Sequence, residues 1–197
     1  YPDLKRAIEA VPAKVRVAVL DSCASGAFTR TKGGTKRAPF MMGSSAEVEG
    51  HAYLTSSSES EAAQESDRIK GSFFTHYLVT GLRGAADENK DRLVTLNEAY
   101  QYAYDETLRR TQATRGGPQH AAYDIRLNGS GDLVLTDLRE TTARVAVADD
   151  IAGRLYIRDR RKNLAAELYK ETKSGELELA LEPGSYTILL DDGRRLK

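Results

Sequence analysis

Several features that define whole classes of protein are absent from this sequence of 197 residues. It has one cysteine, no tryptophan and a formal net charge of zero. A single cysteine cannot form a disulfide within the chain and is typical of a reducing compartment, so we expect a cytoplasmic protein. Without a net charge, no global field attracts nucleic acid or an acidic membrane surface. No apolar run approaches the roughly 20 residues that cross a bilayer.

The remaining composition is that of an ordinary globular protein, with 29% charged and 40% hydrophobic residues. The length predicts one large domain with a smaller addition. The first residue is Tyr1 and not Met. We therefore expect a chain that was cut from a longer precursor, with any targeting signal in the missing part.

Residues 1–139 alternate between strand-like and helix-like patterns. Residues 15–20 form a near-continuous apolar run, which fits a buried parallel strand, and residues 52–56 suggest a second strand. Residues 57–70 are polar and loop-like. Amphipathic patterns predict helices over residues 1–10, 72–82 and 96–110, and shorter strands over 123–127 and 132–135. This order predicts an α/β domain.

The residue pattern changes after Asp137, and we place a domain boundary between residues 139 and 140. Short alternating runs, typical of β-strands, cover residues 144–148, 154–158, 165–169, 176–181 and 185–190. Turn signals such as Pro183-Gly184 separate them. Residues 140–197 are therefore predicted to form a small antiparallel, sandwich-like β domain, with packing or partner docking as its simplest role.

Cys23 lies where the first predicted strand runs into a turn of Ser and Gly residues. This position would expose the thiol at the carboxyl edge of a parallel sheet, where ligands bind in open α/β folds. The alternative is a buried structural cysteine, the usual state of a free cysteine. Position alone leaves both interpretations open.

The residues around Cys23 resemble a known motif. Asp21-Ser-Cys-Ala-Ser-Gly26 is similar to the nucleophile motif of the caspase and metacaspase superfamily. Further segments resemble bacterial caspase-like peptidases in order and spacing: Leu54-Thr-Ser-Ser-Ser58, Gly71-Ser-Phe-Phe74, Gly81-Leu-Arg-Gly-Ala-Ala-Asp87 and Val94-Thr-Leu-Asn-Glu98. The resemblance covers about residues 15–138. It implies a caspase-like fold, in which helices flank a mostly parallel sheet, and a cysteine endopeptidase that acts on proteins or peptides without a metal or other cofactor.

The resemblance also implies a catalytic dyad. Cys23 would attack the scissile carbonyl, and a histidine would protonate the leaving amine. In this family the histidine lies roughly 50 residues before the cysteine, whereas only 22 residues precede Cys23. We therefore expect it on a separate N-terminal fragment of the same precursor. His51, His76 and His120 do not match it in order and are interpreted as structural or surface histidines.

A preference for basic residues before the cut follows from the same comparison. Caspases that cut after aspartate have Gln where this chain has Asp21, and their clamping Arg corresponds to Ser66. A carboxylate in a partly buried slot would favour Arg or Lys and repel Asp. We expect Gln64, Glu65 and Ser66 to offer main-chain groups to an extended substrate.

One stretch has the ligand spacing of an EF-hand calcium loop. Asp87, Asn89, Asp91, Thr95 and Glu98 fall at positions 1, 3, 5, 9 and 12. Arg92, however, stands at the sixth position, where the sharp turn needs glycine. We therefore expect a solvated turn before the next helix and no metal site.

The sequence also bears on self-processing and on alternative functions. Arg30, Lys32, Lys36 and Arg37 lie in a Gly-containing stretch, which we expect to be a loop that suits cleavage by the enzyme itself. We expect the precursor to cut itself before Tyr1 and thus to be a zymogen, and the resemblance implies a bacterial enzyme. The alternative is a catalytically silent, caspase-like scaffold whose β domain binds a protein partner. A cysteine ligase or transpeptidase of related fold is a weaker third option.

Overall fold

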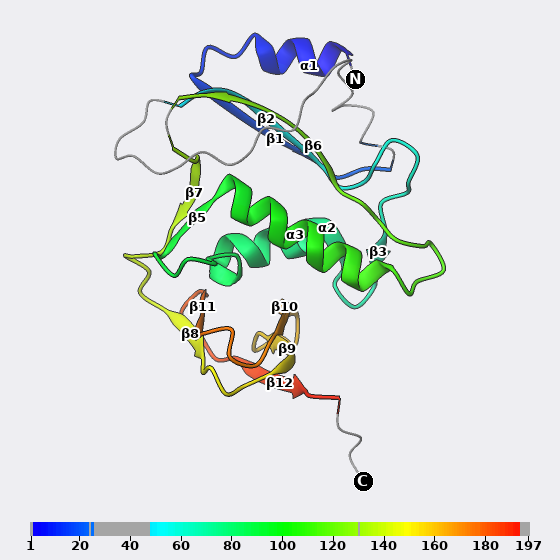
Figure 1. Ribbon diagram of the computed structural model, residues 1–197. Coiled ribbons are helices and arrows are strands. Elements are labelled where there is room, and N and C mark those ends of the chain that lie inside the picture. The colour runs from blue at the N-terminus through cyan, green and yellow to red at the C-terminus, as the bar shows by residue number, and fades with distance from the viewer. Residues whose placement is uncertain (1, 24, 26–47, 130, 194–197) are drawn as a thin grey trace. The chain divides into compact units, whose positions relative to one another are not determined.

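The computed structural model describes residues 2–23, 25, 48–129 and 131–193. In these residues the chain is a mixed α/β protein with helices α1, α2 and α3 and several small sheets (Figure 1). It divides into two compact units. Tyr1–Gln64 and Thr107–Leu133 form the first unit, and Glu65–Glu106 and Val134–Lys197 form the second. No described helix has the length and apolar character needed to cross a membrane.

The first unit is built on a three-stranded sheet. Its strands are β1 (Val15–Leu20), β2 (Glu49–Thr55) and β6 (Ala122–Asn128), in the order β1-β2-β6. β1 and β2 are parallel, as the apolar run of β1 predicts, and β6 is antiparallel to β2. The predicted burial of β1 was wrong, because β1 lies at the edge of the described sheet and none of its residues is fully buried. β2 is the central strand, and its residues from Ala52 to Thr55 are completely buried.

Helix α1 (Pro2–Glu9) lies along one face of this sheet (Figure 1). It contacts the sheet through Lys5, whose Nζ lies 3.5 Å from a carboxylate oxygen of Asp124 and 5.3 Å from the ring centroid of Tyr53. The register aligns Tyr53 with Asp124, so both side chains lie on the same face. The contact orders the segment that leads into β1.

The second unit begins with a hairpin of two very short strands, β3 (Glu65–Ser66) and β4 (Gly71–Ser72). Helix α2 (Phe73–Thr80) follows directly, because Ser72 caps it by accepting a hydrogen bond from the Thr75 N–H at 3.1 Å. A single π-helical turn (η2, Gly81–Ala85) extends α2. β5 (Leu93–Thr95) pairs with β7 (Val134–Asp137), and α3 (Leu96–Thr111) passes from the second unit into the first after Glu106.

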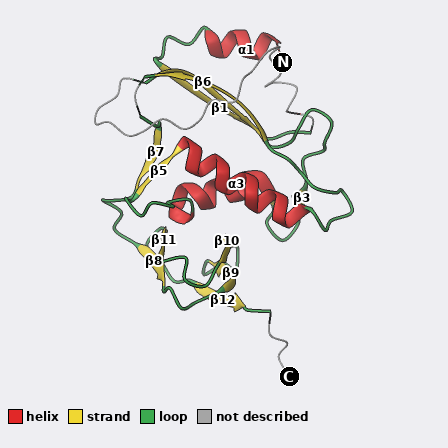
Figure 2. Cartoon of the chain, viewed as in Figure 1, coloured by secondary structure: helices red, strands yellow, loops and turns green. Residues whose placement is uncertain are grey.

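Residues 140–197, here called the β module, carry the remaining strands of the second unit (Figure 2). These are β8 (Arg144–Val147), β9 (Gly153–Arg158), β10 (Leu164–Lys170), β11 (Leu177–Ala180) and β12 (Thr187–Asp191). They form two antiparallel sheets, ordered β10-β9-β12 and β11-β8. The five predicted strands are all present. Burial alternates along β8 and β11, whereas β9 and β10 are largely buried and β12 is exposed throughout.

The compact units do not divide at residue 140, where we expected the domain boundary. Ala85 of η2 packs against the apolar core of the β module. Gly84, with φ of 120°, lets the backbone of η2 approach β11 so closely that an added Cβ would lie 2.4 Å from the Glu178 carbonyl oxygen. The residue pattern of the sequence changes near residue 140, but these packing contacts join the β module to Glu65–Glu106 in one unit.

The β3–β4 hairpin was also missed, since residues 57–70 were expected to be a loop. Two-residue strands are too short to show an alternating pattern. The hairpin depends instead on its turn, in which the Ile69 and Lys70 N–H groups both donate to the Ser66 carbonyl, at 3.0 and 2.7 Å. Lys70 has φ of 60°, the left-handed conformation that closes the turn.

Candidate functional site

Cys23 lies in a tight turn immediately after β1, and its side chain is exposed. The Ser25 N–H donates to the Ser22 carbonyl at 3.2 Å, which closes the turn around the thiol. The position after the strand is the one we predicted, and its exposure argues against a buried structural cysteine. An exposed thiol can be deprotonated and reach an electrophile, which a buried one cannot.

Ser56, just after β2, fixes the turn that carries Cys23. Its N–H donates to the Leu20 carbonyl at 2.9 Å, and its hydroxyl donates to the Ser22 carbonyl at 3.4 Å. The hydroxyl of Ser25 lies 3.4 Å from that of Ser56. Ser25 and Ser56 are both completely buried. The exposed thiol therefore stands on a turn whose base is buried and hydrogen-bonded.

The thiol lies beside the end of Tyr1–Gln64, the first of the two segments that make up the first unit. Cys23 Sγ is 4.0 Å from the Ala63 carbonyl oxygen, and the next residue, Gln64, is one of the predicted substrate-binding residues. The Gln64 side chain donates to the Gly117 carbonyl at 2.7 Å and accepts from the Thr114 hydroxyl at 2.6 Å. The structure thus brings Cys23 and Ala63–Gln64 together within one unit.

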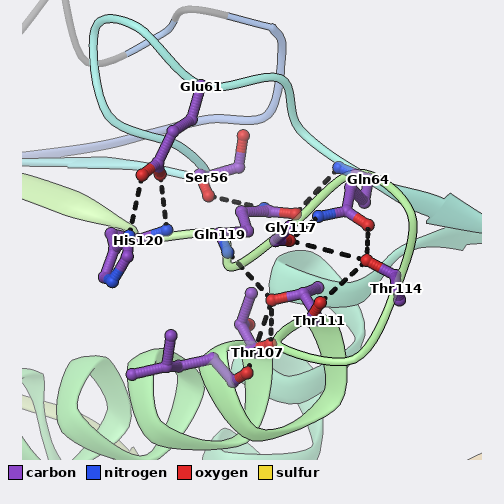
Figure 3. A network of polar contacts seen from close by, with 10 residues as sticks. Ser56, Glu61, Gln64, Thr107, Thr111, Thr114, Gly117, Gln119 and His120 are labelled. Carbon is purple, nitrogen blue, oxygen red and sulfur yellow. Dashed lines mark hydrogen bonds and ion pairs between the residues drawn. The ribbon is translucent and has the colours of Figure 1, made fainter.

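Gln119 is a functional candidate that the sequence analysis missed (Figure 3). It is completely buried. Its side-chain oxygen accepts from the Gln64 N–H at 2.8 Å, and its side-chain nitrogen donates to the Ser56 carbonyl at 2.6 Å. One amide therefore joins the residue that fixes the Cys23 turn to the segment beside the thiol.

The engagement of Gln64 corrects part of the expectation for substrate binding. Its N–H is donated to Gln119, so it does not offer that group to a peptide. The Gln64 side chain lies so close to the chain after α3 that a Cβ on Gly116 would be 2.8 Å from its Cδ. No prediction from the sequence involved Gln119, because a single polar residue in the turn after Gly116-Gly117-Pro118 carries no pattern that marks it.

A second contact, between Glu61 and His120, holds the same loop (Figure 3). The His120 N–H donates to Glu61 Oε2 at 2.7 Å, and ring Nδ1 lies 2.8 Å from Oε1. Burial by itself would raise the pKa of the Glu61 carboxyl, but hydrogen bonds from His120 and Ser58 outweigh it and lower that pKa. The pair fastens residues 57–64 to the chain before β6.

The other predicted substrate-binding residues are placed as follows. Asp21 is exposed, so the described chain does not hold it in the partly buried slot that we expected. A strand end leaves its side chain to solvent unless another segment covers it. Glu65 and Ser66 form β3 at the start of the second unit, with Glu65 exposed and paired in register with Ser72.

Two further histidines are engaged within their own units. His51 stacks on Tyr53, with ring centroids 4.4 Å apart, and burial lowers the pKa of its imidazole. His76 Nε2 accepts a hydrogen bond from the Glu167 N–H at 3.2 Å, which places the proton of the neutral ring on Nδ1. Burial lowers the pKa of His76 as well. These surroundings suit structural histidines.

In the calcium-like stretch, residues 87–98, carboxylate oxygens accept hydrogen bonds from backbone N–H groups of the same stretch. The two carboxylate oxygens of Asp87 accept from the Asp91 and Arg92 N–H groups at 3.2 and 3.0 Å. Glu98 accepts from the N–H and the hydroxyl of Thr95, a capping arrangement at the start of α3. Among the described residues no cluster of three His, Cys, Asp or Glu side chains could hold a metal ion.

Several predicted features lie outside the described residues. These are Gly26 of the nucleophile motif and the basic stretch with Arg30, Lys32, Lys36 and Arg37. Comparison of the chain with protein-family models, with curated proteins and with solved structures found no match.

Proposed function

We propose that this chain is the nucleophile-bearing part of a caspase-like cysteine endopeptidase that cleaves after Arg or Lys. The carrying observation is the exposed Cys23 thiol at the end of β1, a strand with a parallel neighbour, on a turn whose base is buried and hydrogen-bonded. A nucleophile gains from such a base, because a fixed turn holds the sulfur where the substrate carbonyl arrives. The resemblance of Asp21–Gly26 to the caspase motif agrees with this placement.

The catalytic histidine is assigned to an N-terminal fragment of the same precursor. His76 Nε2 accepts from the Glu167 N–H, His120 Nδ1 lies against Glu61, and the ring of His51 stacks on Tyr53. The outer edge of β1 pairs with no strand among the described residues, and Val17 and Val19 on it are 41% and 45% exposed. An apolar strand with a free edge is suited to receive another strand. A fragment that docks there would extend the parallel sheet, cover Asp21 and bring the histidine to Cys23.

In this proposal Asp21 supplies the preference for basic substrates. Its carboxylate lies two residues before the nucleophile, on the same strand end. When substrate and upstream fragment exclude water, the attraction between this carboxylate and a guanidinium strengthens. An aspartate in the substrate would be repelled there. The protein is proposed to act in the cytoplasm on protein or peptide substrates, without a cofactor.

The test of the nucleophile uses the precursor that contains the upstream fragment. We expect Cys23→Ala to abolish cleavage of Arg- and Lys-containing fluorogenic peptides and labelling by iodoacetamide, while circular dichroism stays unchanged. His120→Gln, whose side-chain amide can still donate to Glu61, is the matched comparison and should keep activity if the dyad histidine lies upstream. Peptidase activity that survives Cys23→Ala would contradict the proposal, and activity lost in both Cys23→Ala and His120→Gln would move the dyad onto this chain.

Self-processing is tested with the same precursor. We expect the wild type to be cut after a basic residue and Cys23→Ala to stay whole, as read by intact mass spectrometry. A mutant that is cut at the same bond would assign the processing to another protease.

The alternative function, a silent scaffold that binds a protein partner, is favoured by one observation. β12 lies at the edge of its sheet, and Ile188, Leu189 and Leu190 are 46%, 57% and 41% exposed. Apolar residues on an edge strand are typical of strand-to-strand association. A precursor that neither labels at Cys23 nor cleaves any peptide of the panel, yet is correctly folded, would favour the scaffold.

A further inference from the structure

We propose that the β module positions the β3–β4 hairpin, and that Arg68 and Tyr156 are the pair through which it does so. The inference rests on the proposed function, because the hairpin begins with Glu65 and Ser66, two of the predicted substrate-binding residues. It gives the β module a part in substrate binding instead of a role as a passive addition.

The hairpin cannot hold its shape through its own strands. β3 and β4 have two residues each, and an isolated two-stranded hairpin is marginally stable at best in water. Its internal bonds are the pairing of Glu65 with Ser72 and Ser66 with Gly71, and the turn that closes on the Ser66 carbonyl. β4 is fixed by the cap of α2. The tip, with Arg68 and Lys70, needs a further support.

That support comes from β9 and the turn after it. The Arg68 guanidinium carbon lies 4.0 Å from the ring centroid of Tyr156, a stacked cation–π contact. The same guanidinium lies 4.0 Å from Glu167 Oε2 on β10. Lys70 Nζ donates to the Asn163 side-chain oxygen at 3.2 Å. Both long side chains of the tip therefore end on the β module.

The surface that receives Arg68 is itself fixed. Glu167 is completely buried and lies 3.1 Å from the Arg154 guanidinium, which also lies 3.6 Å from Glu106 of α3. The Arg83 guanidinium donates to the Ala165 carbonyl at 2.6 Å, so β10 is tied to η2 as well. Tyr156 is 7% exposed. A buried, ion-paired base can hold a flexible tip, whereas a mobile module could not.

The chain is thus held within each unit, on both sides of the Gln64–Glu65 bond. Gln119 holds Gln64 within the first unit, and the β module holds the hairpin within the second. Loss of the second support frees Glu65 and Ser66 without touching Cys23. Arg68 is accordingly a positioning residue, and its loss should weaken substrate binding more than bond cleavage.

The experiment compares Arg68→Ala, Arg68→Lys and Tyr156→Leu with Arg160→Ala, an exposed arginine of the turn between β9 and β10. In the active precursor we expect Arg68→Ala and Tyr156→Leu to raise KM roughly two- to fivefold, the factor that corresponds to an exposed cation–π contact. Turnover and iodoacetamide labelling of Cys23 should change little. Arg68→Lys keeps the charge and should recover part of the loss, and Arg160→Ala should behave as wild type.

Hydrogen exchange keeps the inference testable apart from catalysis. We expect faster exchange at the Ile69 and Lys70 amides in Arg68→Ala and Tyr156→Leu, with α2 and β9 protected as in wild type. Unchanged exchange in both variants would overturn the support by the β module. A wild type without peptidase activity would overturn the proposed function and the expected effect on KM. The exchange result would still decide whether the β module holds the hairpin. A fall in turnover at unchanged KM would overturn the positioning role.

Discussion

Replacing Gln119 by leucine keeps the side-chain volume and removes two hydrogen bonds at the centre of the first unit. The Gln64 N–H and the Ser56 carbonyl would both lose their partner. Gln119 is completely buried, so a water molecule cannot simply replace the lost amide. Each unsatisfied buried group costs about 1–3 kcal/mol. We therefore expect the free energy of unfolding to fall by roughly 2–6 kcal/mol, a large part of the 5–15 kcal/mol of a typical domain.

Urea unfolding measures this change directly. The chain has ten tyrosines and no tryptophan, so tyrosine fluorescence and far-ultraviolet circular dichroism are the suitable signals. Gln112→Leu is the matched control, since Gln112 is exposed, and it should change the free energy of unfolding by no more than about 0.5 kcal/mol. Equal midpoints for Gln119→Leu and Gln112→Leu would refute the assignment.

Gln119→Glu tests the direction of the two bonds. A carboxylate can still accept from the Gln64 N–H, but it would face the Ser56 carbonyl with a second oxygen. The protonated form can donate there, so the folded state should raise the pKa of the new Glu above its usual range. A raised pKa gives stability that is present at low pH and lost as the pH rises. We expect the difference from wild type to be smaller at pH 4 than at pH 7, and the opposite trend would contradict the assigned orientation.

Three further predictions concern other parts of the chain. Asp21→Asn should lower kcat/KM for Arg peptides about 10- to 150-fold relative to neutral ones, because a charge-assisted contact from which water is excluded contributes about 1.5–3 kcal/mol; an unchanged ratio would remove Asp21 from the pocket. Burial lowers the pKa of His76, with Glu167 opposing and Arg83 adding to the shift, so its contribution to stability is complete above pH 6.5 and lost as the pH falls. His76→Gln should flatten the wild-type decrease in Tm between pH 7.5 and 5.5. Gly84→Ala should destabilise the second unit by about 1–3 kcal/mol, since Gly84 has positive φ and lies against the Glu178 carbonyl, whereas Gly71→Ala, with open space around it, should leave Tm within a few degrees of wild type.

Local pattern was sufficient for most secondary structure. The apolar run of residues 15–20 predicted β1, and five alternating runs predicted the strands of the β module. Apolar and polar residue types that alternate along a strand have a period of two, and this period is visible in the sequence without the fold. The position of Cys23 after a strand could be predicted in the same way, because the turn residues adjoin the strand.

Only the tertiary structure decided which distant residues meet. Gln119 lies 55 and 63 residues from Gln64 and Ser56, the residues that it joins, and no periodicity connects them. Arg68 and Tyr156 meet because η2 and the β module pack in one unit, a contact that depends on the missing Cβ of Gly84. The exposure of Asp21 was likewise decided by which segments cover the end of β1. The sequence by itself determined the elements and the candidate nucleophile, because those depend on neighbours along the chain; the surroundings of the site depend on packing between segments far apart, which only the fold brings together.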